Sequence, residues 1–280
     1  MTGGYRYSYN VIGFGGEDVA RSAERLARFG YDAMEVEGEP EKHDPRRVKT
    51  AADDAGLKIS SVCPNFTPNR DLSHPDPGIR SKAQKYLRSL ADFAAEVGAP
   101  LFIVAPTAYL RVEPLADPRD EWRWAVAGVR EAGEYAGTLG VDLALECWNR
   151  YGTYMLNRLD EGVRLWRETG LSNGGVMADT FHMNVEESSP LEAVRALGGL
   201  LNHVHLSDSN RLAPGLGHID FAGFIRALEE TGYGGYLAFE LIPDLPNRLG
   251  VDGERETSLE DVARQAIEHS RASERQGVSS

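Results

Sequence analysis

Short apolar runs alternate with longer amphipathic stretches along most of this chain. The apolar runs have the length of buried strands, and we expect strands at Tyr5–Ile12, Ala33–Val36, Lys58–Cys63, Leu101–Ala105, Asp142–Glu146, Val176–Asp179, Val204–Ser207 and Leu237–Glu240. Apolar residues at helical spacing predict helices at Glu17–Phe29, Arg80–Val97, Glu121–Leu139, Leu159–Thr169, Pro190–Leu197, Phe221–Thr231 and Leu259–Ser270. A glycine just past a helical stretch, as at Gly30 and Gly170, fits a left-handed helix cap.

A strand followed by a helix, repeated about eight times, predicts parallel strands joined by right-handed crossovers. Periodicity alone fits both a closed (β/α)8 barrel and a doubly wound open sheet. We favour a single (β/α)8 TIM barrel over residues 1–270, since the chain has 280 residues and no evident linker. The polar residues 271–280 are expected to form a flexible C-terminal tail.

The composition narrows the class of protein. The formal net charge is −13, which leaves no electrostatic footprint for nucleic acid or an anionic membrane. The sequence shows neither a signal peptide at its start nor an apolar run near the ~18 residues of a membrane span. Two cysteines, Cys63 and Cys147, do not suggest a disulfide framework. We therefore expect a cytoplasmic enzyme with reduced thiols that acts on a small molecule.

Four consecutive apolar runs end in, or lead to, a residue type that binds metal ions. These residues are Glu146, Asp179, His205 and Glu240, and they lie 26 to 35 residues apart, the length of one strand–helix unit. In a barrel, four neighbouring strands would present them at the carboxyl mouth, where active sites lie. A single acid there would usually cap a helix, and a single histidine would usually be a core residue.

Four such residues in series favour a metal site instead, because buried carboxylates must be paired or must bind a metal. An oxygen-rich set suits Mn²⁺, Mg²⁺ or Co²⁺. We predict one divalent ion, with Mn²⁺ as the preferred one.

At these residues the sequence resembles the xylose-isomerase-like sugar isomerase/epimerase barrels, and most closely the ketose 3-epimerases of the D-tagatose 3-epimerase type. The resemblance covers nearly the whole chain, and the segments that carry it are 145–151 (LECWNRY), 178–184 (ADTFHMN), 203–206 (HVHL), 210–211 (NR), 214–217 (PGLG) and 239–240 (FE). It implies that the four residues are the family's metal ligands, that His182 and Arg211 meet substrate oxygens, and that the protein forms dimers or tetramers.

Two of the presumed ligands also suggest a mechanism. Glu146 and Glu240 come from strands well separated around the mouth, so a metal-bound ketose would lie between them. One carboxylate would remove the α proton, and the other would return a proton to the opposite face of the enediolate. Inversion of the carbon next to the ketone is the expected result. Phe66, Tyr109 and Trp148 follow presumed strands and are candidates to stack on the sugar, although core packing fits each equally well.

One position departs from the resemblance. After the first glutamate, the ketose 3-epimerases read Asn-Arg-Tyr/Phe-Glu, whereas this chain has Gly152 in place of the last acid. The missing carboxylate would contact terminal hydroxyls, so a modified, larger or cyclic keto-sugar is as good a candidate substrate as a simple ketohexose.

Other functions share this fold. A metal-dependent lyase or dehydratase acting on a keto-inositol or 3-keto-glycoside would use the same site and enediolate, and is the alternative function. A three-zinc apurinic endonuclease would need additional histidines after the third and fourth strands, where this chain has Cys63-Pro64 and Pro106-Thr107. A barrel that only binds sugar is disfavoured by two flanking glutamates beside a complete set of metal ligands.

Overall fold

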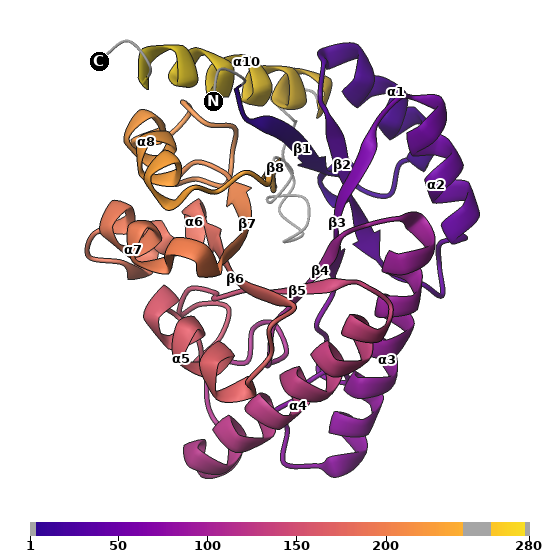
Figure 1. Cartoon of the computed structure of the whole chain (residues 1–280), viewed down its shortest axis with the longest axis vertical. Coiled ribbons are helices and arrows are strands. Elements are labelled where there is room, and N and C mark those ends of the chain that lie inside the picture. The colour runs from indigo at the N-terminus through magenta and orange to yellow at the C-terminus, as the bar shows by residue number, and fades with distance from the viewer. Residues whose placement is uncertain (1–3, 243–258, 278–280) are drawn as a thin grey trace, which may run out of the picture.

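The computed structural model describes residues 4–242 and 259–277. Parallel strands form one closed barrel in sequence order, and the last strand pairs with the first (Figure 1). The strands are β1 (Arg6–Asn10), β2 (Ala33–Gly38), β3 (Lys58–Pro64), β4 (Leu101–Val104), β5 (Asp142–Leu145), β6 (Gly174–Asp179), β7 (Leu201–Leu206) and β8 (Tyr236–Phe239). Closure of the sheet confirms the TIM barrel and excludes the open doubly wound sheet.

Helices surround the barrel as a ring (Figure 1). They are α1 (Val19–Phe29), α2 (Pro45–Asp54), α3 (Pro77–Val97), α4 (Pro118–Thr138), α5 (Leu159–Thr169), α6 (Thr180–Glu186), α7 (Pro190–Leu197), α8 (Phe221–Thr231) and α10 (Leu259–Gly277), with short 3-10 turns η1 (Val11–Phe14) and η2 (Gly198–Leu200). The bounds of α5, α7 and α8 agree with the sequence prediction. Helices α2 and α6 were not predicted from the sequence.

Local sequence explains where several helices begin and end. Helix α2 begins at Pro45, after Asp44, whose side chain accepts a hydrogen bond from the backbone of Arg46. Proline at the first helical position has no backbone N–H, but that N–H would have no partner within the helix. The aspartate cap accepts a hydrogen bond from another N–H group of the first turn that would otherwise be unpaired. Gly30 and Gly170 end α1 and α5 with φ values of 80° and 71°, the left-handed conformation predicted for them.

The C-terminal helix is longer than the sequence predicted. Helix α10 continues through Gly277, so residues 271–277, expected to be a flexible tail, are helical; residues 278–280 lie outside the described part of the chain. The extension is held by contacts with the start of the barrel. Arg271 donates a hydrogen bond to the Gly30 carbonyl at 2.6 Å, and the Glu274 carboxylate accepts one from the Tyr5 backbone at 2.6 Å.

The barrel interior has an apolar side and a polar side. Side chains from β3 to β6 pack into an apolar cluster that consists of Cys63, Leu101, Ile103, Ala144 and Met177, with Ile12 against it. The polar side is formed by strands β1, β2, β3 and β7, and its buried residues include Ser8, Glu35, Ser61, His203 and His205. Buried polar groups need hydrogen-bond partners or ions, so the contacts of these residues bear on the chemistry of the barrel.

Two further predictions bear on the class of protein. Cys63 and Cys147 are both free and buried. Across residues 4–242 and 259–277, no helix combines the length and the apolar character that crossing a membrane requires.

Candidate active site

The four predicted metal ligands lie on neighbouring strands at the carboxyl mouth of the barrel. Glu146 directly follows β5, Asp179 ends β6, His205 lies in β7 and Glu240 directly follows β8. The backbone N–H groups of Glu146 and Glu240 continue the sheet ladder, since they donate to the carbonyls of Val104 at 2.9 Å and Leu206 at 3.2 Å. One ligand atom from each of the four side chains lies within 4.8 Å of the others.

The Nδ1 atom of His205 is at the centre of this group. It lies 3.3 Å from a carboxylate oxygen of Glu240, 3.6 Å from one of Asp179 and 3.9 Å from one of Glu146. It is buried and has no hydrogen-bond partner among the described residues. An unpartnered nitrogen facing three carboxylates is suited to binding a cation, and a nitrogen with three oxygen ligands fits Mn²⁺, Mg²⁺ or Co²⁺.

Asp179 has two structural roles. Its Oδ1 accepts hydrogen bonds from the backbone N–H groups of Phe181 and His182, which caps helix α6, while Oδ2 faces His205. The helix-cap alternative and the metal-ligand alternative for this residue therefore do not exclude each other. Because α6 begins immediately after the strand, His182 lies in the first turn of this short helix.

His182 is held beside the metal-ligand group as a neutral ring. Its side chain is buried, and Nδ1 accepts a hydrogen bond from the backbone N–H of Asn149 at 3.0 Å. Burial lowers the pKa of His182 to about 4, and the attraction of Asp179 only partly offsets this. Because Nδ1 is an acceptor, the proton of the neutral ring resides on Nε2, which makes Nε2 a donor.

Arg211 contacts two of the candidate metal ligands directly. Its Nη1 donates to both carboxylate oxygens of Asp179, and its Nη2 donates to Glu240. Its backbone has φ of 63°, an uncommon conformation for a residue other than glycine, and strained backbone of this kind clusters at functional sites. The guanidinium is buried with the carboxylates and places a fixed positive charge beside them.

The two candidate catalytic carboxylates are in different electrostatic environments. Burial, and then repulsion from Glu240, raises the pKa of Glu146 to about 8. Burial would also raise the pKa of Glu240, but the charge of Arg211 outweighs it and holds that pKa below its usual value. Three carboxylates beside one guanidinium leave an excess of negative charge, which a divalent cation would balance.

The three predicted aromatic residues form one chain of edge-to-face contacts. Ring centroids of Phe66 and Trp148 are 6.1 Å apart, and those of Tyr109 and Trp148 are 5.3 Å apart. Phe66 is only 2% exposed and also packs against Tyr86, so it offers almost no surface to a ligand. Tyr109 is 50% exposed; burial of part of its side chain raises its pKa, and the charge of Arg211 acts in the opposite direction.

Gly152 lies against this aromatic chain. A Cβ atom at this position would lie 3.0 Å from Cε2 of Tyr109 and 3.3 Å from Cβ of Trp148. A larger residue would therefore need Tyr109 to move. Because Gly152 has no side chain, the Tyr109 ring packs close to the point that a Cβ atom at position 152 would occupy.

One charged residue of the barrel interior was not predicted from the sequence. Glu35 of β2 is fully buried and accepts hydrogen bonds from the side chains of His203 and His205. The sequence could have indicated this residue through its position in the strand. Glu35 lies two residues after the buried Ala33, so both side chains point to the same face of the sheet. A carboxylate in that position needs a partner, which only the folded chain reveals.

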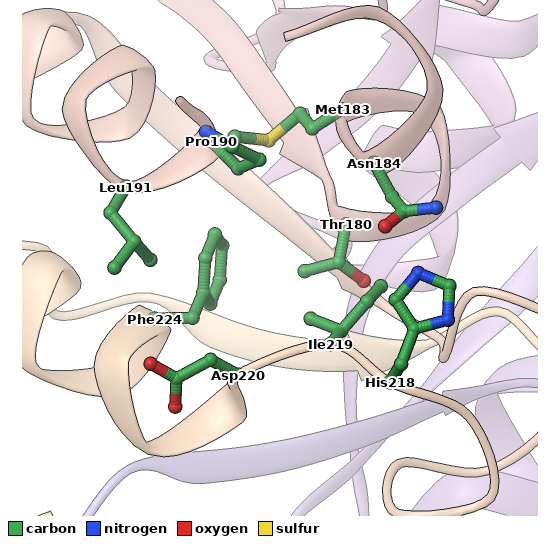
Figure 2. A pocket seen from close by; sticks show the side chains of 9 residues that line it. All are labelled: Thr180, Met183, Asn184, Pro190, Leu191, His218, Ile219, Asp220 and Phe224. Atoms are coloured by element: carbon green, nitrogen blue, oxygen red, sulfur yellow. The ribbon is translucent and has the colours of Figure 1, made fainter. Parts of the chain in front are cut away.

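The described residues also form two hollows outside the group of candidate site residues. One, of about 630 Å³, is formed by the loops after β1 and β2, and its lining residues include Ile12, Glu37 and His43. The other, of about 190 Å³, lies between α6, α7 and α8 (Figure 2). In Figure 2, Met183, Pro190, Leu191 and Phe224 give it an apolar wall, and none of the predicted site residues lines it.

Comparison with known proteins agrees with this geometry. Residues 23–273 match the family model described as xylose isomerase-like TIM barrel. The chain is 30% identical over 266 residues to the D-psicose 3-epimerase of Ruminiclostridium cellulolyticum, covering 89% of each chain. It is 27% identical over 231 residues to the 3-dehydro-D-guloside 4-epimerase of Escherichia coli, covering 80% of this chain and 87% of the relative.

The fold comparison gives the same result. The crystal structure of D-psicose 3-epimerase with D-tagatose from Clostridium cellulolyticum H10 superimposes with a TM-score of 0.87 at 27% identity, covering 95% of this chain and 98% of that one. The match of the family model over most of the chain confirms the resemblance inferred from the motifs. The chain belongs to the xylose isomerase-like TIM-barrel family and is an enzyme of the isomerase class, related to the ketose 3-epimerases.

Proposed function

We propose that this protein is a metal-dependent epimerase that inverts the carbon next to the ketone of a ketose or keto-sugar. The observation that carries the proposal is the position of the His205 Nδ1 atom, which faces the carboxylates of Glu146, Asp179 and Glu240 at the barrel mouth. The names of the relatives, which are sugar epimerases, support the reaction class.

Glu146, Asp179, His205 and Glu240 would hold the divalent ion. When bound, such an ion would polarise the substrate's ketone and make the neighbouring C–H group more acidic. We expect Mn²⁺, with Mg²⁺ or Co²⁺ as alternatives, because three of the four donors are carboxylates.

The two glutamates would exchange protons with the substrate carbon. Glu146 and Glu240 extend from β5 and β8, with β6 and β7 between them, so a substrate between them presents one face to each. One glutamate would take the proton from the carbon, and the other would return a proton to the opposite face. Each acts as base in one direction of the reaction and as acid in the other.

Arg211 and His182 would stabilise the negative charge that develops on the substrate oxygens. Arg211 is a permanent cation whose burial strengthens its electrostatic effect. His182 is neutral and its Nε2–H is available to donate, because its Nδ1 already accepts from Asn149. Neither residue needs to lose a proton for this role.

The surroundings of Gly152 favour a substrate other than a free ketohexose. No carboxylate extends from this position, and the exposed ring of Tyr109 packs beside it. We propose a keto-sugar with a ring or substituent, a substrate type that the name of the 3-dehydro-D-guloside 4-epimerase also suggests.

A metal-replacement experiment tests the proposal. Protein stripped with a chelator should be inactive, and adding Mn²⁺ should restore activity and raise the melting temperature, because a ligand that binds only the native state stabilises it. Ketoses and 3-keto-glycosides incubated with the Mn²⁺ enzyme in D₂O should gain deuterium at the inverted carbon. Loss of water or of the aglycone would instead indicate the lyase. Activity unaffected by stripping would contradict the proposal.

A further inference from the structure

A hydrogen-bonded cluster lies inside the barrel beside His205. It contacts the Nε2 atom of the ring, whereas Nδ1 faces the three candidate carboxylate ligands. Its centre is the carboxylate of Glu35, which is fully buried. This carboxylate accepts from Nε2 of His205 at 2.9 and 3.1 Å, from Nε2 of His203 at 2.8 Å and from the Ser61 hydroxyl at 2.5 Å. Several donors are what a buried charge needs to remain ionised.

The contact between Glu35 and His205 crosses the barrel. Glu35 is in β2 and His205 is in β7, and strands β1 and β8 lie between them in the sheet. The side chains therefore meet through the interior and not along a strand pair. His203 is two positions before His205 in β7, so both rings point to the same interior face and both reach the same carboxylate.

The hydrogen bond determines which nitrogen of His205 can bind a cation. A carboxylate only accepts hydrogen bonds, so Nε2 must carry a proton. In a neutral ring, Nδ1 then has a free lone pair, and Nδ1 is the atom that faces Glu146, Asp179 and Glu240. In the other tautomer, Nδ1–H would donate to those carboxylates and could not bind a metal ion.

We propose that Glu35 is a positioning residue that keeps His205 in the Nε2–H tautomer, with the Nδ1 lone pair directed at the three carboxylates of the site. This inference rests on the proposed metal-dependent function. Metal-binding histidines commonly donate their other ring N–H to a carboxylate, which fixes the ring and increases its basicity as a ligand. His203 keeps the Glu35 carboxylate oriented by donating to it at the same time.

The cluster has a competing interpretation. Glu35, His203 and His205 also bring three possible ligand atoms within 4.8 Å of one another, so they are a second candidate metal group. In that case His205 would bind through Nε2, and the hydrogen bonds to Glu35 would be replaced by metal contacts. The number of ions bound and the protonated nitrogen of His205 distinguish the two interpretations.

The first test measures Mn²⁺ binding to the wild type and two variants, with electron paramagnetic resonance of the free ion as the readout. Glu35→Gln has one acceptor oxygen for two imidazole donors and should weaken binding roughly 10- to 100-fold. Ser61→Ala is the matched control: it removes a hydrogen bond to the same carboxylate but leaves both histidine contacts, and its affinity should stay within about threefold of the wild type. The wild type should bind one ion per chain.

Three outcomes would overturn the inference. One is a folded Glu35→Gln protein that binds Mn²⁺ as tightly as the wild type, and another is a wild type that binds two ions per chain. Either result would leave the proposed function standing. A wild type that binds no Mn²⁺ would overturn the proposed function together with the inference.

A second measurement needs no variant and therefore remains decisive if Glu35→Gln does not fold. Nitrogen-15 NMR of the histidine side chains in the Mg²⁺-loaded wild type should show His205 neutral and protonated on Nε2. A His205 ring protonated on Nδ1 in the loaded protein would overturn the inference.

Discussion

The guanidinium of Arg211 donates hydrogen bonds from Nη1 to both carboxylate oxygens of Asp179, at 2.9 and 2.8 Å. Its Nη2 donates to Glu240, so one cation pairs two of the four residues proposed to hold the metal. Arg211 is thus bound to the candidate metal ligands and is also proposed to stabilise charge on the substrate, so its loss should affect the metal and the chemistry in different ways.

Replacing Arg211 by methionine should lower turnover about 100-fold at saturating Mn²⁺, because the transition state loses a buried positive charge. Mn²⁺ affinity should be unchanged or tighter, because the positive charge beside Asp179 and Glu240 is removed. Steady-state kinetics and Mn²⁺ titration measure the two effects separately. The control is Arg164→Met, since the Arg164 side chain is 66% exposed and pairs with Glu168 on the surface. Loss of Mn²⁺ binding in Arg211→Met would contradict this division of roles.

His182 should remain neutral throughout the working pH range. Burial lowers its pKa to about 4, whereas an unfolded histidine titrates near 6.5. The native state thus binds fewer protons than the unfolded state between these values, so the stability contributed by the neutral ring is complete above about pH 6.5 and is lost as the pH falls toward 4. NMR titration of the His182 ring tests this directly, and a midpoint near 6.5 would show that the prediction is wrong.

The neutral ring also predicts the effect of mutation. His182→Ala should keep the metal and lose about 100-fold in turnover, which is the effect of removing one donor to developing charge. Measured Mn²⁺ content separates this from a structural defect. If the variant loses its metal, His182 supports the ligand Asp179 and not the substrate.

Position 152 should influence substrate choice. Gly152→Glu introduces a carboxylate at the mouth and requires Tyr109 to move, since the new Cβ would lie 3.0 Å from its ring. The ratio of kcat/KM for free ketohexoses to that for a 3-keto-glycoside should rise about 10-fold or more, the effect of one hydrogen-bonded substrate hydroxyl. Gly152→Ala is the control, because it adds the same Cβ without a charge. If Gly152→Glu and Gly152→Ala give the same ratio of kcat/KM values, the side chain at position 152 does not determine substrate choice.

The sequence predicted which residues come together at the mouth better than it predicted the contacts inside the barrel. The proximity of Glu146, Asp179 and Glu240 could be predicted because each lies at the end of an apolar strand, and the carboxyl ends of the strands meet at one mouth of the barrel. Glu35 could not, because its partners His203 and His205 are far away in sequence and on a strand that is not a neighbour in the sheet.

Other differences have similar physical causes. Residues 271–277 look like a polar tail, but Arg271 and Glu274 make specific contacts with Gly30 and Tyr5, and such contacts leave no periodic apolar signal. Helix α6 is a seven-residue helix, too short for a periodic pattern, and it is started by the side chain of Asp179. Phe66 follows a strand, as a pocket residue would, yet its ring packs between Tyr86 and Trp148.

The central claim is that Glu146 and Glu240 exchange protons with opposite faces of one carbon. The matched substitutions are Glu146→Gln and Glu240→Gln, because an amide keeps an oxygen for the metal but cannot accept the substrate's proton. Both Mn²⁺-replete variants should lose nearly all net epimerisation.

Proton NMR of each epimer, incubated with each Mn²⁺-replete variant in D₂O and freed of the ion before the spectrum is recorded, is the most direct test of this claim. Each variant should exchange deuterium into only one epimer, the one whose proton faces the remaining glutamate, and the two variants should select opposite epimers. One variant inactive in every assay beside another with substantial turnover would indicate a single-base isomerase or lyase. Wild-type epimerisation by both metal-bound variants would show that neither glutamate is the base.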